Sequence, residues 1–118
     1  MDSFADPSSR KARRAATREA RDAFPPIGIY AIRDRASGYR LLGASRHVHA
    51  ALNRARFELG LGKHAAGVLQ AEWNRSGAEG LVFEVLELVK ERVDADFDYV
   101  SELKDLEQIH RELHGLTR

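Results

Sequence analysis

The chain has 118 residues, a net charge of +1 and 43% hydrophobic residues, which is the size and balance of one globular domain. It contains no cysteine, which excludes disulfides and thiolate zinc sites and is typical of a reducing cytosol. No apolar run approaches the roughly 20 residues of a membrane span, and no apolar secretion signal begins the chain, so we expect a cytoplasmic protein without membrane association.

The charges are distributed unevenly along the chain. Residues 25–83 contain eight Lys and Arg against four Asp and Glu, whereas residues 84–118 contain five against ten. A basic body beside an acidic end is compatible with a surface that faces a polyanion. It is equally compatible with ordinary solvated helix surfaces, because the pI of about 8.2 is below the range typical of nucleic-acid-binding domains.

The first predicted element is a basic helix over residues 9–23. Its apolar stripe consists only of alanines, so the helix would fray in isolation, and Pro25-Pro26 ends it. We therefore predict an N-terminal extension over 1–24 and a single domain over 25–118. Arg13 and Arg14 in the extension suit an arm that tracks phosphates, although a solvated helix explains them equally well.

A β-hairpin is predicted next. Residues 27–34 alternate apolar with small or polar residues and predict a strand, and residues 39–44 predict the returning strand. The four residues between them end in Gly38, which supplies the positive φ of a turn.

Two helices follow, over 47–59 and 64–74. Ser45 is the predicted N-cap of the first helix, and His64 is predicted to begin the second. The side chains predicted to face inward are Val48, Leu52, Ala55, Leu59, Val68, Leu69 and Trp73.

A third strand over 81–89 and a final helix over 98–115 complete the prediction. Both faces of the strand are largely apolar, interrupted by Glu84 and Glu87, as in a central strand covered on both sides. The fold class is therefore α+β, with a small three-stranded antiparallel sheet flanked by helices and an extra N-terminal basic helix. The predicted buried stripe of the final helix is Val100, Leu103, Leu106, Ile109 and Leu113.

The order of these segments resembles the GIY-YIG endonuclease superfamily. The segments that carry the resemblance are Gly28-Ile29-Tyr30, Gly43-Ala44-Ser45-Arg46, and residues 59–64, 69–77, 82–87 and 102–107. The resemblance covers residues 27–113 and implies a GIY-YIG-like nuclease domain. It further implies hydrolysis of DNA phosphodiesters with one divalent ion, Mg²⁺ or Mn²⁺.

The resemblance assigns the family's site residues only in part. In this family a tyrosine pair, a helix arginine and a glutamate of the C-terminal helix act together. Tyr30 matches the first tyrosine, and Glu107 matches the metal-binding glutamate. The second tyrosine position is Leu41, the arginine position is Ala51, and the position of a frequent histidine is Ala55.

The chemistry explains these residue types. A hard cation binds oxygen ligands such as a carboxylate, an arginine offers bidentate donors to phosphate, and a tyrosine hydroxyl can position water. Losing one preorganised electrostatic group costs about 10²–10³ in rate. Arg54, on roughly the same helix face as Ala51, and Tyr39, on the same sheet face as Leu41, are the candidate substitutes.

Several basic residues are candidates for nucleic-acid contacts, although each alone is better explained as a solvated surface charge. His47 and His49 begin a helix, where residues two apart diverge, so we do not expect them to form a metal site. Besides the two arginines of the extension, the candidates are Arg33, Arg46, Arg56, Lys63 and His64.

Three interpretations of function remain open. The first is a metal-dependent DNA endonuclease, acting on branched or nonspecific DNA. The second is a non-catalytic nucleic-acid-binding relative, and the third is a protein-interaction module that uses the acidic final helix. Leu41 and Ala51 favour the second over the first, whereas Tyr30 and Glu107 argue against complete loss of activity.

Overall fold

The fold is α+β, as predicted, with a three-stranded sheet flanked by helices. The computed structural model describes residues 24–116, so the predicted helix over 9–23, with Arg13 and Arg14, lies outside the described residues. The elements are β1 (Gly28–Asp34), β2 (Arg40–Ser45), α2 (Val48–Gly60), α3 (Gly67–Ser76), the 3₁₀ helix η2 (Gly77–Gly80), β3 (Leu81–Leu88) and α4 (Tyr99–Leu113). Between residues 24 and 116, no helix has the length and apolar character needed to cross a membrane.

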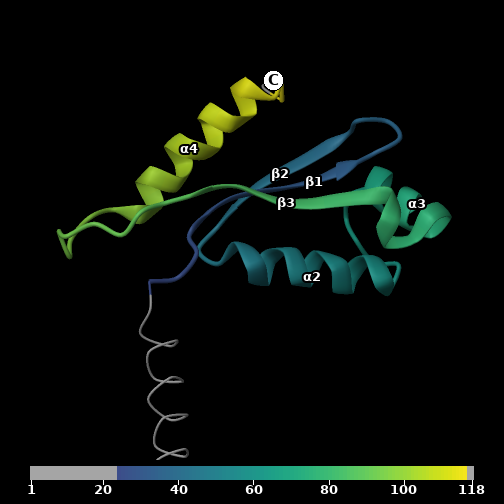
Figure 1. Ribbon diagram of the computed structural model, residues 1–118, viewed down its shortest axis with the longest axis horizontal. Helices are drawn as coiled ribbons and strands as arrows, with labels where there is room; N and C mark the ends of the chain where they lie inside the picture. Colours follow the sequence, from purple (N-terminus) through teal and green to yellow (C-terminus); the bar gives the residue numbers. More distant parts are fainter. Residues whose placement is uncertain (1–23, 117–118) are drawn as a thin grey trace, which may run out of the picture.

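The strands form one antiparallel sheet in the order β2-β1-β3. Figure 1 shows α2 and α3 on one face of this sheet and α4 on the other. Covering a sheet with helices on both faces requires apolar side chains on both faces of its strands. The central strand β1 meets this requirement, with Ile29 and Ile32 both fully buried.

The first core layer lies between the sheet and the helices α2 and α3. It joins Ile32 of β1, Leu69 of α3 and Leu81 of β3 to the apolar face of α2. The predicted face of α2 is confirmed, because its buried residues are Val48, Leu52, Ala55 and Leu59. The predicted face of α3 is wrong in part, because the side chain of Val68 is 46% exposed.

The second core layer lies between the sheet and α4. It joins Ile29 of β1 and Leu42 of β2 to Leu103 and Leu106 of α4. The buried stripe predicted for α4 is too wide, since its other three apolar residues lie beyond the edge of this contact. The exposed members are Val100, Ile109 and Leu113.

The strand β3 is an edge strand, whereas the prediction made it central. A β-bulge also interrupts it, because Ile29 and Tyr30 are adjacent in β1 but their partners in β3 are two residues apart. Beyond the bulge the side chains of β3 exchange faces. Glu87 therefore faces α4, where its carboxylate lies 2.8 Å from His110 Nε2, and Val89 joins the core under α4.

The helix α2 begins one residue later than predicted, and its cap differs. The N-cap is His47, whose Nδ1 accepts the N–H of Ala50 at 3.1 Å. Ser45, the predicted cap, instead accepts the N–H of His47 at 2.9 Å and shapes the turn before the helix. An imidazole nitrogen thus fills the acceptor role that serine, threonine, aspartate or asparagine usually fills.

The helix α3 begins at Gly67 and not at His64. The His64 side chain accepts the N–H of Ala66 at 3.0 Å, and the backbone N–H of His64 donates to Gln70 Oε1 at 2.9 Å. These two bonds satisfy backbone groups in a loop conformation, so the helix starts after them.

We expect Gly28→Ala to destabilise the fold by about 1–3 kcal/mol, because a methyl group there overpacks the backbone of β3. A Cβ at this position would collide with the carbonyl oxygen of Glu87 and lie 3.0 Å from Leu88 Cα. The matched control is Gly60→Ala, where nothing lies within 4 Å. Urea unfolding should leave this control unchanged or up to about 1 kcal/mol more stable. Equal stability of the two variants would contradict the packing argument.

Candidate functional site

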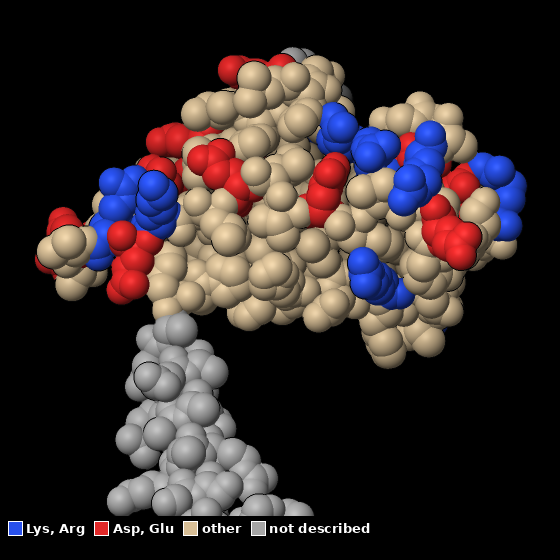
Figure 2. Space-filling view, in the orientation of Figure 1, with Lys and Arg blue, Asp and Glu red and all other residues tan. Residues whose placement is uncertain are grey.

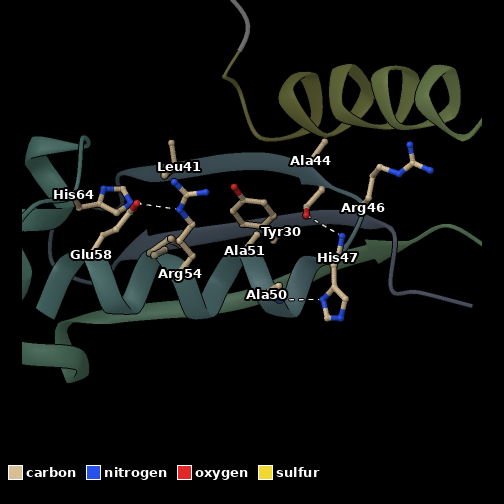
Figure 3. Close-up of a pocket in the computed structure, with 13 residues that line it drawn as sticks. Tyr30, Leu41, Ala44, Arg46, His47, Ala50, Ala51, Arg54, Glu58 and His64 are labelled. Atoms are coloured by element: carbon tan, nitrogen blue, oxygen red, sulfur yellow. Dashed lines mark hydrogen bonds and ion pairs between the residues drawn. The ribbon is translucent and has the colours of Figure 1, made fainter. Parts of the chain in front are cut away.

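A pocket of about 660 Å³ lies between the sheet and α2, and several of the predicted site residues line it (Figure 3). β1 contributes Tyr30 to its lining, and β2 contributes Leu41. The helix α2 contributes Ala51 and Arg54, and the loop after α2 contributes His64. The pocket therefore gathers residues from four parts of the chain that the sequence places up to 34 positions apart.

Tyr30 reaches the pocket by crossing the neighbouring strand over Gly43. A Cβ added to Gly43 would lie 2.6 Å from Cζ and 2.5 Å from the hydroxyl oxygen of Tyr30. The ring therefore occupies the space that any other side chain at position 43 would fill. Packing of the Tyr30 ring therefore explains why position 43 is a glycine. The same packing fixes where the phenol hydroxyl lies.

The Tyr30 hydroxyl lies in a negative environment. Burial first, and then the charges of Glu107 and Glu58, raise the pKa of the Tyr30 hydroxyl above its ordinary value of 10.0. At neutral pH this hydroxyl is therefore protonated and can donate a hydrogen bond. A bound cation would oppose the effect of the two carboxylates and lower this pKa again.

Glu107 comes from α4, on the opposite face of the sheet, and it does not line the pocket. Its carboxylate accepts from Arg111 at 2.8 Å, one turn further along the helix. The same Arg111 nitrogen lies 3.4 Å from the carbonyl oxygen of Leu42 in β2. Glu107 is thus held near the edge of the sheet, close enough for its charge to act on Tyr30.

This arrangement can hold a divalent cation only if Glu107 is the single protein carboxylate that binds it. Among residues 24–116 no three His, Asp or Glu side chains are grouped to hold a metal. The ion pair between Glu107 and Arg111 is partly exposed, so it contributes little and a cation could replace the arginine. The remaining ligands would have to be water and substrate oxygens, as is usual for Mg²⁺.

Arg54 is the residue that the sequence analysis predicts as a substitute for an arginine at the position of Ala51. It lines the same pocket as Ala51, and its side chain is 81% exposed. Its Nε donates to Glu58 Oε2 at 3.2 Å, one turn further along α2. Tyr39, the other candidate substitute, does not line the pocket.

The structure separates the predicted nucleic-acid contacts into two groups. Arg46 and His64 line the pocket together with Arg54. Arg33 and Arg56 lie elsewhere. Arg33 faces the α4 side of the sheet, 3.9 Å from Glu84, and Arg56 stacks over Phe83 at 4.3 Å along the other side of α2.

Lys63 is exposed in the loop between α2 and α3 and does not line the pocket. Figure 2 shows one face of the molecule, on which Lys and Arg gather near α3 and near the connection between β3 and α4. Asp and Glu lie among them in both places. That face therefore carries mixed charge, and attraction of a polyanion would depend on local groups such as those at the pocket.

Three residues that shape the site are not predicted from the sequence. His47 lines the pocket and also caps α2. Glu58 partly neutralises the charge of Arg54, and Arg111 donates a hydrogen bond to the carboxylate of Glu107. The last two follow their partners at a spacing of four on a helix, which is a detectable signal. His47 carried no such signal, because histidine is an unusual N-cap.

Comparison with solved structures identifies the fold. A mutant form of the catalytic domain of intron endonuclease I-TevI is 17% identical, and the match covers 75% of this chain and 84% of that chain with a TM-score of 0.58. The catalytic domain of homing endonuclease I-TevI is 22% identical, with 75% and 88% covered and a TM-score of 0.53. By sequence, the chain matches no family model and no curated protein. The structural likeness confirms the GIY-YIG-like fold that the sequence predicts.

We expect Glu107→Gln to lower the pKa of the Tyr30 hydroxyl, because removal of a nearby negative charge favours the phenolate. The pKa should still lie above its ordinary value, since burial remains. The measurement is a pH titration by NMR with ring-labelled tyrosine, which resolves the three tyrosines of the chain. Asp105→Asn, an equal charge change on the exposed side of α4, is the control and should leave Tyr30 unchanged. An unchanged Tyr30 titration in Glu107→Gln would show that Glu107 does not act on this hydroxyl.

Proposed function

We propose that this domain binds DNA at the pocket and hydrolyses its phosphodiester slowly with a divalent metal ion. In this proposal Tyr30 orients the attacking water, Glu107 holds Mg²⁺ or Mn²⁺, and Arg54 contacts the phosphate. The observation that carries it is the convergence of Tyr30 and Arg54 on one pocket, with the charge of Glu107 acting on the Tyr30 hydroxyl.

Tyr30 and Glu107 supply complementary groups. The protonated hydroxyl of Tyr30 can donate a hydrogen bond to a water molecule and hold it in line with a phosphorus atom. The carboxylate of Glu107 supplies the single charged oxygen ligand that a hard cation needs. The metal ion would supply charge stabilisation at the phosphate oxygens.

Arg54 supplies the positive charge at the phosphate. Its exposed side chain is free to move from Glu58 to a phosphate oxygen, because an exposed ion pair of this kind contributes about 0.3–0.5 kcal/mol at most. A guanidinium offers two parallel donors to a phosphate. Arg46 and the loop residue His64 line the same pocket and can hold the neighbouring backbone.

The low rate follows from the residues that the site lacks. The positions of the second tyrosine and the helix arginine are Leu41 and Ala51, and both line the pocket without any polar side-chain atom. Each missing group costs about 10²–10³ in rate. Arg54 supplies a positive charge, but its exposed side chain is less constrained than a preorganised group would be. It therefore recovers only part of the lost rate.

DNA is the proposed polymer because both structural neighbours are described as endonuclease catalytic domains. The basic groups at the pocket contact backbone rather than base edges, so we propose low sequence specificity. Non-catalytic DNA binding on the same fold is the second candidate. Leu41, Ala51 and Ala55 favour it, because together they replace three polar groups of the family on one wall of the pocket.

The first test is cleavage of supercoiled plasmid and of branched DNA in Mg²⁺ or Mn²⁺. We expect slow nicking that falls about 10²-fold or more in Glu107→Ala, since the carboxylate that holds the metal is lost. Asp105→Ala on the same helix is the control and should retain the rate. Equal nicking by wild type and Glu107→Ala would indicate a contaminating nuclease, and absence of nicking would leave the binding function alone.

The second test is DNA binding in EDTA at several salt concentrations. Affinity should fall steeply with salt, because phosphate contacts release counterions. Arg54→Ala should reduce the slope of log K against log salt by about one, the contribution of one phosphate contact. Arg92→Ala is the control, because Arg92 lies in the connection between β3 and α4, outside the pocket lining, where it pairs with Glu102. Binding that does not depend on salt would contradict a phosphate-facing surface and favour a protein partner.

A further inference from the structure

We propose that the pocket takes a single unpaired nucleobase, so that the preferred DNA is one with an extrahelical or single-stranded nucleotide. This inference rests on the proposed function, because it requires that DNA binds at the pocket. It concerns what fills the pocket, whereas the proposed function concerns the groups that contact the backbone.

The deep side of the pocket is apolar. Ile32 is fully buried and Ala55 is 6% exposed, and Leu41 and Ala51 complete this wall. None of these side chains has a hydrogen-bonding atom, so a charged phosphate would lose its hydration here without compensation. The flat apolar face of a nucleobase suits such a wall, because burying it removes apolar surface from water.

The size of the pocket agrees with this occupant. A volume of about 660 Å³ lies within the range of about 300–1,000 Å³ that is usual for small-molecule sites. The half-buried ring of Tyr30 lines the same space and supplies an aromatic surface for stacking (Figure 3). Stacking of bases on aromatic side chains is tolerant of sequence, as required for a site without base-edge readers.

The polar groups lie at the mouth and the ends of the pocket. Arg46 and Arg54 are charged and exposed, and the acidic side chain in the lining, Glu58, is already paired with Arg54. His47 and His64 each use Nδ1 as the acceptor of a backbone N–H, which leaves Nε2–H as a donor. An inserted base would thus lie against the apolar wall while its sugar and phosphates meet these donors.

A base within a paired duplex cannot fill this pocket, because its faces are covered by its neighbours. Extruding a paired base costs a few kcal/mol, whereas an unpaired base costs least. The pocket should therefore discriminate between DNAs by the availability of a base and not by sequence. This preference differs from a general preference for bent or flexible DNA, because it requires the base itself.

The test compares three duplexes of equal length in EDTA, measured by fluorescence anisotropy. One is fully paired, one carries a single bulged 2-aminopurine nucleotide, and one carries an abasic nucleotide at the bulge. We expect the bulged base to be bound about tenfold more tightly than both others, which corresponds to one stacked base. The 2-aminopurine emission should also change on binding, because the base moves from solvent into the pocket.

Ala51→Leu fills the space beside the apolar wall, so the affinities for the three duplexes should become equal. The dependence of binding on salt should not change. Ala71→Leu is the matched control, because Ala71 is exposed on α3 outside the pocket lining, and it should keep the preference. Leu41→Asn, close in size but polar, should weaken the preference without filling the space. It serves as the second variant if Ala51→Leu does not fold.

Equal affinity of wild type for the bulged base and the abasic bulge would overturn this inference while leaving DNA binding intact. A preference that survives both Ala51→Leu and Leu41→Asn would also overturn it, because the base would then lie elsewhere. If the protein binds none of the three duplexes, the proposed function itself is overturned, and the inference with it.

Discussion

The burial of β1 on both faces is the constraint on which the rest of this structure depends. Its backbone pairs with strands on both sides, and Ile29 and Ile32 enter the two core layers, one above and one below the sheet. Tyr30 lies between them in the strand and is only partly buried. Its ring leaves the core across β2, where Gly43 has no side chain to block it. Core packing therefore sets the position of the hydroxyl around which the pocket forms.

The same packing uses two positions at which the resemblance predicts polar groups. Leu41 and Ala55 pack in the core layer beneath α2. Burying apolar side chains there stabilises the domain, whereas a tyrosine hydroxyl or an imidazole would need a polar partner. The GIY-YIG-like fold thus forms in this chain with apolar side chains at both positions, and these side chains make one wall of the pocket apolar.

The features that follow a local rule could be predicted from the sequence. The buried face of α2 follows from helical periodicity, and the neighbourhood of Arg54 and Ala51 follows from helix geometry. The sequence shows the apolar faces of β3 but not its place at the edge, because in a small sheet covered on both sides an edge strand and a central strand have similar patterns. Ser45 is the predicted cap of α2 because serine is the commoner cap, whereas His47 supplies the acceptor in the structure.

The features that depend on pairing between distant segments could not be predicted. The spacing of Glu107 and Arg111 is visible in the sequence, but their place at the edge of β2 depends on how α4 packs. The amino-acid sequence of β3 likewise gives no signal of the bulge. The bulge is defined by the register of β3 against β1, which shifts between Ile29 and Tyr30.

The bulge also determines how related strands should be aligned. It reverses the parity of β3, so that odd-numbered residues face α2 before it and α4 after it. A relative without the bulge would lack one residue at the position of Leu86. The residue equivalent to Glu87 would then follow Val85 directly and would still lie opposite Ile29, on the side of His110. An alignment of such a relative without a gap at this point would exchange inward and outward residues over the rest of the strand.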